Sequence, residues 1–279
     1  MAIILDGKKL SEKILHELEE KISNLDKKPS FAVILVGNDP ASELYVNIKE
    51  KKSKLLGINF SKITYPENID EKTLLKKIEE LNKDDKIDAM LVQMPLPKHI
   101  NAQNIIQAIS PKKDADGITP ENIGRISIGA EPFAYPCTPL GIVKLLEEYK
   151  IELQGKHAVI IGRSNIVGKP LAQMLLNKNA TVTICHSKTK NLSQITKTAD
   201  ILISAIGSPK FVKKDMVKQN ATVIDVGTSK SKGKTLGDVD FENVLPLSSY
   251  ITPVPGGVGP MTIACLMKNV LEISRLRLY

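Results

Sequence analysis

The chain has 279 residues, of which 42% are hydrophobic and 25% charged, the balance of an ordinary globular protein. This composition excludes a disordered tail protein and a fibre, and no apolar run approaches the ~18 residues that a membrane span requires. The net charge of +8 either solubilises the surface or attracts anionic small molecules. Nucleic acid is a less favoured partner, because a chain without Trp and with 4% aromatic residues has few rings on which bases could stack.

Helical and strand patterns alternate through the first part of the chain. Apolar residues at helical spacing predict an amphipathic helix over Lys8–Leu25, and the continuous apolar run Phe31–Val36 predicts a strand buried on both faces. The elements expected after them are a helix at Ala41–Leu56, a strand at Asn59–Tyr65, a helix around Leu74–Leu81, a strand at Ile87–Gln93 and a short helix around Ile105–Ile109.

Regular periodicity is lost between Ser110 and Pro139, where Pro, Gly, Asp and Thr dominate. A stretch of this length is unusual as a plain connection, so we predict that it is functional or a domain junction. Thr138 and Pro139 have the residue types of an N-cap and a first-turn proline, which predicts a helix over Leu140–Tyr149.

The second half repeats the alternation of strands and helices. Its predicted strands are His157–Ile161, Thr181–Cys185, Ile201–Ala205 and Thr222–Val226. Its predicted helices are Gly168–Leu176 and, after a Gly/Pro-rich segment, Met261–Leu276. Strands separated by helices predict the α/β class, with a parallel sheet that is covered on both faces.

The strand at His157–Ile161 runs directly into a turn, Gly162–Gly168, and then into a helix. This order is the context of a dinucleotide-binding fingerprint, in which backbone N–H groups at the helix N-terminus bind phosphate. Ser164 and Val167 stand where the fingerprint has its second and third glycines, so an ordinary structural turn is the alternative.

The residues after the next strand bear on the choice of nicotinamide cofactor. An NAD site usually has Asp or Glu at the end of its second strand. Here His186, Ser187 and Lys188 follow Cys185, and Arg163 lies in the phosphate turn. Hydroxyl and cationic groups in place of a carboxylate favour the extra 2′-phosphate of NADP.

Polar side chains that could carry chemistry lie in the first half. Tyr45 and Lys49 share one face of a predicted helix, although a helix lysine is usually a solvated surface charge. Gln93 ends a buried strand, where α/β proteins place their ligands. Asp116 lies in the aperiodic stretch beside Asp114, and an Asx turn before Gly117 is the alternative explanation for both carboxylates.

The cysteines and histidines predict neither a disulfide framework nor a metal site. The three cysteines lie far apart, the four histidines have no ligand spacing, and Cys137 is expected to be a buried structural thiol. Asp6 interrupts the N-terminal apolar stretch too early for a signal peptide, so we expect a cytoplasmic protein.

A series of segments resembles the bifunctional methylenetetrahydrofolate dehydrogenase/cyclohydrolase family over nearly the whole chain. In the order in which the family has them, the segments are YVNIKEK (45–51), QMPLP (93–97), PKKDADG (111–117), PCTP (136–139), GRSNIVGKP (162–170), CHSKT (185–189), GDVDF (237–241) and TPVPGGVGPMT (252–262). The last segment and the GRSxxVG pattern are the most specific of them.

The resemblance implies two α/β domains around a cleft. Residues 1–139, completed by a C-terminal helix at 261–279, would form a catalytic, folate-binding domain, and residues 140–260 a Rossmann-type NADP-binding domain. The implied protein is a cytoplasmic homodimer of one-carbon metabolism and purine biosynthesis, without nucleic-acid or membrane partners. It would oxidise 5,10-methylenetetrahydrofolate to 5,10-methenyltetrahydrofolate with NADP and hydrolyse the product to 10-formyltetrahydrofolate.

The resemblance also implies roles for single residues. Lys49 matches the catalytic lysine, Gln93 the residue that holds this lysine through its side-chain amide, and Asp116 the aspartate that binds the pterin edge. The residues that would line the folate site are Tyr45, Pro255 and Gly256. The residues that match nucleotide-contacting positions are Gly162, Arg163, Ser164, Ser187 and Thr228.

Two other functions stay open at this point. One is a dehydrogenase that lacks the hydrolytic activity or prefers NAD; Lys49, Gln93 and Asp116 argue against the loss, whereas Thr228, in place of a common Ile, weakens the cofactor assignment. The other is a non-catalytic protein that binds nucleic acid or folate, which would rest on the net charge of +8.

Overall fold

The computed structural model describes residues 2–231 and 234–276. The chain divides into two compact units, which we name by their sheets. The six-stranded unit consists of Met1–Glu12, Ile126–Gly129 and Pro136–Cys265, and the three-stranded unit of Lys13–Arg125, Ala130–Tyr135 and Leu266–Tyr279.

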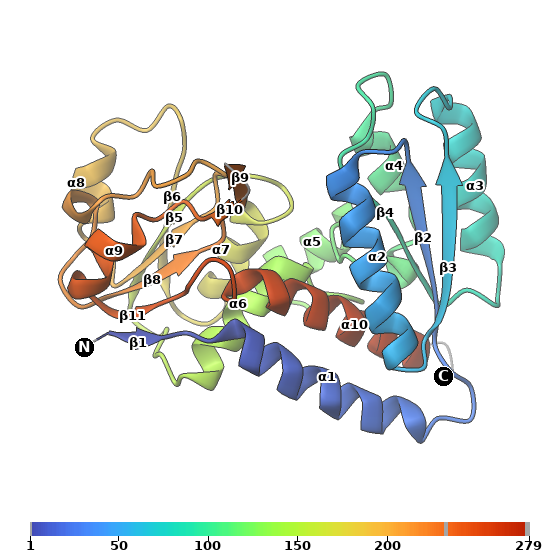
Figure 1. The fold of residues 1–279 in the computed structure, drawn as a ribbon, viewed down its shortest axis with the longest axis horizontal. Coiled ribbons are helices and arrows are strands. Elements are labelled where there is room, and N and C mark those ends of the chain that lie inside the picture. The colour runs from blue at the N-terminus through green and yellow to red at the C-terminus, as the bar shows by residue number, and fades with distance from the viewer. Residues whose placement is uncertain (1, 232–233, 277–279) are drawn as a thin grey trace. The chain divides into compact units, whose positions relative to one another are not determined.

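The six-stranded unit is built on a parallel sheet with the strand order β1-β11-β8-β7-β5-β6 (Figure 1). Its strands are β1 (Ile3–Ile4), β5 (His157–Ile161), β6 (Thr181–Cys185), β7 (Ile201–Ser204), β8 (Ala221–Asp225) and β11 (Ser248–Ile251). A separate antiparallel pair is formed by β9 (Ser229–Ser231) and β10 (Lys234–Leu236).

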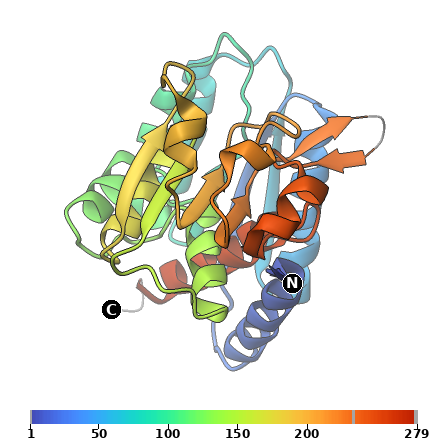
Figure 2. The same ribbon diagram turned by 90° about the vertical axis from the view of Figure 1, so that its left-hand side faces the viewer.

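Helices flank this sheet, whose strands are seen side by side in Figure 2. The helical segments of the unit are α6 (Cys137–Glu148), α7 (Gly168–Leu176), α8 (Leu192–Thr196), α9 (Phe241–Val244), η2 (Lys214–Met216) and η3 (Leu245–Leu247). Helix α7 packs against β5 and β6, and α6 packs against α7. The central strands β7 and β8 are buried along their whole lengths, as expected of a sheet that is covered on both faces.

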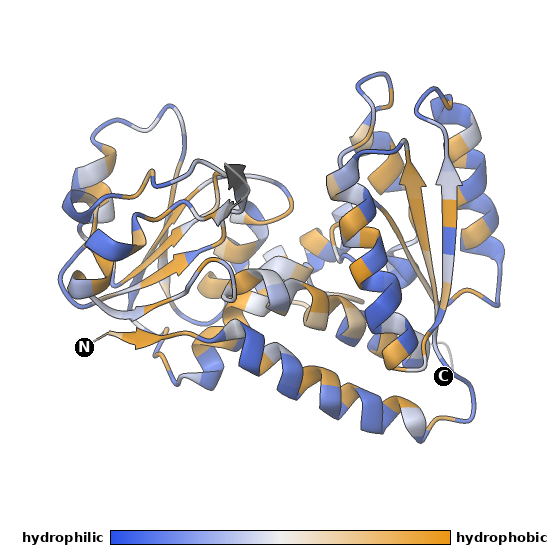
Figure 3. Ribbon diagram, viewed as in Figure 1, coloured by the Kyte–Doolittle hydropathy of each residue, from blue (hydrophilic) through white to orange (hydrophobic). Residues whose placement is uncertain are grey.

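The three-stranded unit holds a second, smaller parallel sheet with the order β3-β2-β4. The strands are β2 (Ser30–Val36), β3 (Asn59–Tyr65) and β4 (Ala89–Val92). After its first residue, Ser30, the central strand β2 is hydrophobic, whereas the edge strand β3 mixes polar and apolar residues (Figure 3). The helical segments are α2 (Pro40–Leu55), α3 (Glu71–Lys83), α4 (Ala102–Ala108) and η1 (Pro111–Lys113).

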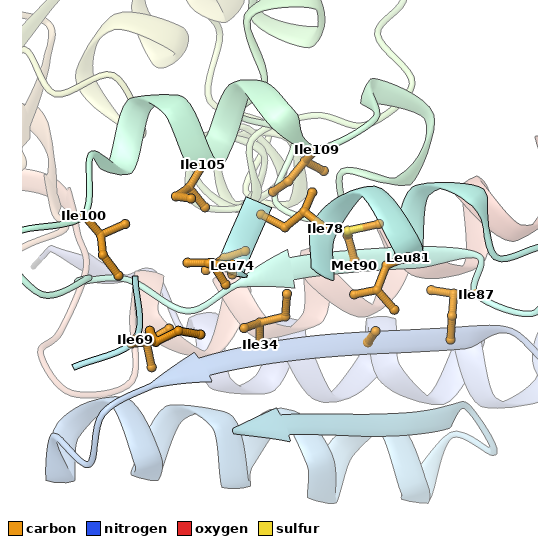
Figure 4. Packing of buried hydrophobic residues seen from close by; sticks show 13 residues of the cluster. Ile34, Ile69, Leu74, Ile78, Leu81, Ile87, Met90, Ile100, Ile105 and Ile109 are labelled. Atoms are coloured by element: carbon orange, nitrogen blue, oxygen red, sulfur yellow. The ribbon is translucent and has the colours of Figure 1, made fainter. Parts of the chain in front are cut away.

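Side-chain caps define where these helices begin. The Asp39 carboxylate accepts a hydrogen bond from the Ser42 N–H at 2.8 Å at the start of α2, and Asp70 does the same for Thr73 at the start of α3. Between the sheet, α3 and α4 lies a core of aliphatic side chains (Figure 4). Its fully buried members are Ala32, Ile34, Leu74, Ile78, Met90 and Ile105.

Three helices have residues in both units: α1 (Gly7–Ser23), α5 (Pro120–Ser127) and α10 (Val258–Leu276). Helix α10 begins three residues earlier than the predicted helix at Met261–Leu276, since Val258, Gly259 and Pro260 form its first turn. The predicted C-terminal helix extended to residue 279, and residues 277–279 lie outside the described part of the chain.

The predicted α/β class is confirmed, and several elements have the predicted bounds, notably β3, β5, β6 and α7. Two details were wrong. Helix α6 begins at Cys137, so Thr138 lies inside it instead of capping it, and the Thr138 hydroxyl forms a hydrogen bond with the Thr262 hydroxyl at 3.0 Å. Helix α5 lies within the stretch predicted to be aperiodic, because a proline start and two apolar residues give too weak a periodic signal.

Candidate functional site

The carboxyl edge of the three-stranded sheet gathers polar side chains from distant parts of the sequence. Gln93 directly follows β4, and its N–H continues the ladder by donating to the Ile34 carbonyl at 2.8 Å. On the other side of β4, Asp114 forms a parallel bridge with Met90, and the Ala115 N–H donates to the Met90 carbonyl at 3.0 Å. The segment 114–116 therefore runs alongside β4 and brings Asp116 toward the edge at which Gln93 lies.

Lys49 is a buried lysine of helix α2, with 9% of its surface exposed. Its Nζ donates a hydrogen bond to Gln93 Oε1 at 2.9 Å, and Gln93 Nε2 donates to the Met94 carbonyl at 2.6 Å. The side-chain amide of Gln93 has an NH₂ group that donates and an oxygen that accepts. Because the NH₂ group donates to the Met94 carbonyl, the oxygen is held toward Lys49. Gln93 thus fixes the position of a buried amine at the sheet edge.

Asp114 and Asp116 have different surroundings. Asp114 is fully buried, and its carboxylate accepts hydrogen bonds from the Gly117 N–H at 2.9 Å and the Thr119 N–H at 2.7 Å. The Asx-turn explanation therefore applies to Asp114. Asp116 is half-buried; desolvation raises the pKa of its carboxyl above the ordinary value, and the nearby Lys49 charge offsets part of this effect.

Backbone geometry after Asp116 and a residue of α10 hold this segment in place. Gly117 has φ +70°, and a Cβ on it would lie 2.4 Å from the Tyr135 carbonyl, so no other residue fits there without a shift. Asn269 Nδ2 donates to the carbonyls of Ala115 at 2.9 Å and Tyr135 at 2.8 Å. Sequence reasoning missed Asn269, for which the only signal is a polar residue within the apolar pattern of the last helix.

Helix α2 also presents apolar groups to the surface close to Lys49 in the sequence. Leu44, Tyr45 and Ile48 are 49%, 45% and 37% exposed. An exposed cluster of large apolar side chains next to a buried amine is suited to binding a flat, partly apolar ring.

The six-stranded sheet has a reversal of strand order between β5 and β7. The chain passes from β5 to its neighbour β6 and then crosses to β7 on the other side of β5. In open α/β sheets, ligands bind outside the carboxyl ends of the strands at such a switch point. The turn at Gly162–Gly168 follows β5, and the segment 205–208 follows β7, so these two segments border the expected crevice.

Two glycines make the turn after β5 tight. Gly162 has φ +126°, and a Cβ on it would lie 2.5 Å from the Ala205 carbonyl oxygen. A Cβ on Gly168 would lie 2.1 Å from the Gly162 carbonyl oxygen. Close backbone packing at the start of α7 is what lets a helix N-terminus approach a phosphate group, so this turn fits a dinucleotide.

Exposed polar residues surround this helix N-terminus. Arg163 and Ser164 are exposed in the turn, and Ser187 is exposed after β6. The two segments are neighbours, because the Gly162 N–H donates to the Cys185 carbonyl at 2.9 Å. The residues directly after β6 offer hydroxyl and cationic groups and no carboxylate. Such groups suit a dinucleotide that carries an additional 2′-phosphate.

The structure places the other residues singled out in the sequence in the six-stranded unit. Thr228 is exposed after β8, on the far side of β7 from the glycine turn. Pro255 is exposed and Gly256 half-buried in the segment between β11 and α10, where the Gly256 carbonyl accepts a hydrogen bond from the Lys8 N–H at 2.8 Å. Both segments follow carboxyl ends of strands in the same sheet.

Because the sequence predicts that this turn binds NADP, replacing Gly168 by alanine is expected to weaken NADP binding by about 100-fold, the scale of a small misplacement in a positioned site. The added methyl group cannot lie 2.1 Å from the Gly162 carbonyl oxygen, so the turn must open. Fluorescence titration of the purified variant with NADP measures the change. Gly124→Ala is the control, since a Cβ on Gly124 meets nothing within 4 Å; equal affinities of both variants would contradict the role of the turn.

The described residues contain neither a cluster of metal ligands nor a helix that could span a membrane. Residues 2–231 and 234–276 hold no group of three or more His, Cys, Asp or Glu side chains that could bind a metal ion. Over the same residues, every helix is too short or too polar to cross a membrane.

Comparison with known proteins identifies relatives of the whole chain. Residues 5–116 match the catalytic-domain model of tetrahydrofolate dehydrogenase/cyclohydrolase, and residues 136–278 match the model of its NAD(P)-binding domain. The chain is 52% identical over 279 residues to the bifunctional protein FolD of Bacillus cytotoxicus, with 99% of this chain and 97% of the relative covered.

Two solved structures are similar to this one over nearly their full lengths. The crystal structure of the bifunctional enzyme FolD, a methylenetetrahydrofolate dehydrogenase/cyclohydrolase from Campylobacter jejuni, has a TM-score of 0.98 at 50% identity and covers 99% of this chain and 100% of its own. The dehydrogenase-cyclohydrolase of Trypanosoma brucei, complexed with NADP cofactor and inhibitor, has a TM-score of 0.95 at 35% identity, with coverages of 99% and 98%.

Proposed function

This chain belongs to the tetrahydrofolate dehydrogenase/cyclohydrolase family, and on that premise we propose that it is a bifunctional one-carbon enzyme. It oxidises 5,10-methylenetetrahydrofolate to 5,10-methenyltetrahydrofolate with NADP and hydrolyses the product to 10-formyltetrahydrofolate. The observation that carries this proposal is the cluster of Lys49, Gln93 and Asp116 at one sheet edge, in which Gln93 holds a buried amine.

The six-stranded unit supplies the cofactor site. The turn at Gly162–Gly168, with Ser164 and the N-terminus of α7, would hold the phosphates, and Arg163 and Ser187 would bind the 2′-phosphate. Thr228 would contact the nucleotide from the segment after β8. When bound, NADP accepts a hydride from the folate methylene carbon, and the protein contributes by holding the two partners at reacting distance.

The three-stranded unit supplies folate-binding groups. Tyr45 would pack against the folate ring with the exposed side chains of Leu44 and Ile48. The ionised Asp116 carboxylate would accept hydrogen bonds from N–H groups of the pterin edge, because an ionised carboxylate is an acceptor only. The family resemblance also assigns Pro255 and Gly256 to the lining of the folate site.

The hydrolysis step requires movement of protons. Water adds to the cationic methenyl carbon, and one carbon–nitrogen bond breaks to leave the formyl group. Both protons leave the water oxygen: one goes to the departing ring nitrogen, and the other goes to solvent. Lys49 Nζ, fixed by its hydrogen bond to Gln93 Oε1, would relay a proton between these positions.

We further propose that residues 1–139 with 261–279 form the folate-binding domain and residues 140–260 the NADP-binding domain. The enzyme would work as a cytoplasmic homodimer that supplies one-carbon units to purine biosynthesis, without nucleic-acid or membrane partners. The matches to a catalytic-domain model at residues 5–116 and to an NAD(P)-binding-domain model at residues 136–278 support a division into these two kinds of domain.

Initial rates of nicotinamide reduction with methylenetetrahydrofolate and either NADP or NAD test the proposed oxidation. The expected result is turnover with NADP and a much higher KM for NAD. Turnover with NAD alone would favour the alternative of an NAD-linked dehydrogenase, and no reduction with either cofactor would favour a binding protein.

Arg163→Ala tests the basis of the cofactor preference. Loss of a charge-assisted hydrogen bond to the 2′-phosphate is expected to raise the KM for NADP by roughly 10- to 100-fold and to leave the KM for NAD unchanged. Lys178→Ala is a suitable control, because Lys178 forms an exposed ion pair with Glu147 at the other end of α7. An equal rise in KM for both cofactors would contradict the assignment of Arg163 to the 2′-phosphate.

A further inference from the structure

Asp238 is a fully buried carboxylate that binds the backbone of the segment after β7. Its Oδ2 accepts hydrogen bonds from the Ile206 N–H at 2.8 Å and the Gly207 N–H at 3.3 Å, and its Oδ1 from the Ser208 N–H at 2.7 Å. The Ser204 hydroxyl donates to Oδ2 at 3.0 Å. One side chain thus holds consecutive N–H groups of a segment that has no regular secondary structure of its own.

The segment that Asp238 holds borders the switch-point crevice. Ala205 directly follows β7, and its carbonyl oxygen is the atom that a Cβ on Gly162 would meet at 2.5 Å. Ile206 is 38% exposed, although large aliphatic side chains are usually buried. The segment 205–208 therefore begins beside the glycine turn and borders the expected crevice at the switch point.

A second buried carboxylate holds Asp238 itself. Asp225, at the end of β8, accepts hydrogen bonds from the Asp238 N–H and the Val239 N–H, each at 2.9 Å. The packing is so close that a Cβ on Gly227 would lie 2.0 Å from Asp238 Oδ1, and a Cβ on Gly237 would lie 2.0 Å from Asp225 Oδ2. The two carboxylates and the two glycines form one closely packed layer that contacts the segment 206–208.

Burial of these carboxylates has an electrostatic cost. Desolvation, with a smaller contribution from the Asp238 charge, raises the pKa of Asp225 to about 6. Ionised at neutral pH, Asp225 therefore lowers the stability of the fold. Buried carboxylates that are perturbed in this way are found preferentially at functional sites.

We propose that Asp238 is a positioning residue for the dehydrogenase reaction, which fixes the backbone of 206–208 as the second wall of the NADP crevice. Asp238 is fully buried, which leaves no surface for direct contact with a ligand in the crevice. It acts through the segment that it holds, and Asp225 supports it. This inference rests on the proposed function, because it assumes that NADP binds at the switch point.

The test compares Asp238→Asn with the wild type in both reactions. In the wild type, both carboxylate oxygens of Asp238 accept hydrogen bonds from backbone N–H groups. An asparagine side chain has one acceptor oxygen and one donor NH₂ group, so it cannot keep the hydrogen bonds at both positions. The Kd and KM for NADP are expected to rise by about 10-fold or more, the factor that corresponds to 1.4 kcal/mol. Hydrolysis of methenyltetrahydrofolate supplied directly needs no NADP, and its kcat and KM are expected to stay within about twofold of the wild type.

A raised KM for NADP with unchanged hydrolysis indicates a positioning role, whereas a loss of folded protein would lower both activities together. Ser204→Ala is a milder second variant that removes one hydrogen bond to Asp238, and a smaller rise in the KM for NADP with unchanged hydrolysis is expected. Asp240→Asn is the matched control: Asp240 lies two positions further along and binds Asn243 Nδ2 at 2.8 Å rather than the segment 206–208.

An unchanged KM for NADP in Asp238→Asn and Ser204→Ala, with an active wild type, would overturn the inference. Equal losses of both activities in both variants would also overturn it. A wild type that neither binds nor reduces NADP would instead overturn the proposed function, so the two failures are distinguishable.

Discussion

Replacing Lys49 by methionine is expected to lower the rate of methenyltetrahydrofolate hydrolysis by about 10²- to 10⁴-fold, the usual contribution of a positioned acid or base. Methionine keeps the length and apolar stem of the lysine, so the buried position of α2 stays filled and the protein folds. NADP binding is expected to be unchanged, because the glycine turn lies in the six-stranded unit. The measurement is the decay of the methenyl chromophore, with NADP titration in parallel.

The matched control for this variant is Lys54→Met on the same helix. Lys54 is exposed and forms an ion pair with Glu50 at 2.6 Å, so its loss is expected to change hydrolysis little. Hydrolysis by Lys49→Met at the wild-type rate would remove Lys49 from the mechanism and would leave Gln93 without a catalytic partner.

Replacing Asp116 by asparagine is expected to have opposite effects on activity and stability. Loss of the proposed charged acceptor for the pterin edge is expected to lower kcat/KM for the folate substrate by about 100-fold or more. The thermal midpoint at neutral pH should rise, because the raised pKa of Asp116 means that its ionised form is unfavourable in the fold. Assays of both reactions and thermal unfolding of the free protein measure the two effects.

The sign of the pH dependence follows from the raised pKa. The ionised Asp116 carboxylate lowers stability at pH values above its pKa in the folded protein, and this penalty disappears as the pH falls through that pKa toward the ordinary value of 3.8. The stability difference between Asp116→Asn and the wild type should therefore shrink on acidification. A variant that is less stable than the wild type at neutral pH would contradict the argument.

Asp70→Asn is a control of opposite sign in the same unit. Hydrogen bonds from Thr73 lower the pKa of Asp70, so its ionised form stabilises the fold at neutral pH. This variant should be less stable than the wild type at neutral pH, and the difference should vanish as the pH falls through the lowered pKa.

Local patterns in the sequence predicted most of the secondary structure. Buried strands such as β5 and helices with a strong apolar stripe such as α3 have signals that tertiary packing does not override. The strands β1 and β11 were not predicted: β1 has only two residues, and β11 begins with two serines and lacks the apolar run that marks β4 and β7. Helix α6 begins at Cys137, earlier than predicted, and Pro136 precedes it without a side-chain cap.

The candidate site could be predicted only in part. The chemistry of Lys49 and Gln93 can be proposed from residue type and position, but their hydrogen bond joins residues far apart in the sequence. The distinction between Asp114 and Asp116 depends on the parallel bridge to Met90, which no local pattern encodes. The roles of Asn269 and Asp238 could not be predicted from local patterns either, because each side chain binds the backbone of a segment that is distant in the sequence.

The central claim is that one protein carries out both the oxidation and the hydrolysis. Wild-type protein supplied with methylenetetrahydrofolate and NADP tests it most directly, with nicotinamide reduction and the methenyl chromophore followed together and the folate product identified. We predict NADP reduction with little accumulation of methenyltetrahydrofolate and 10-formyltetrahydrofolate as the product. Accumulation of methenyltetrahydrofolate in step with NADP reduction would contradict this account.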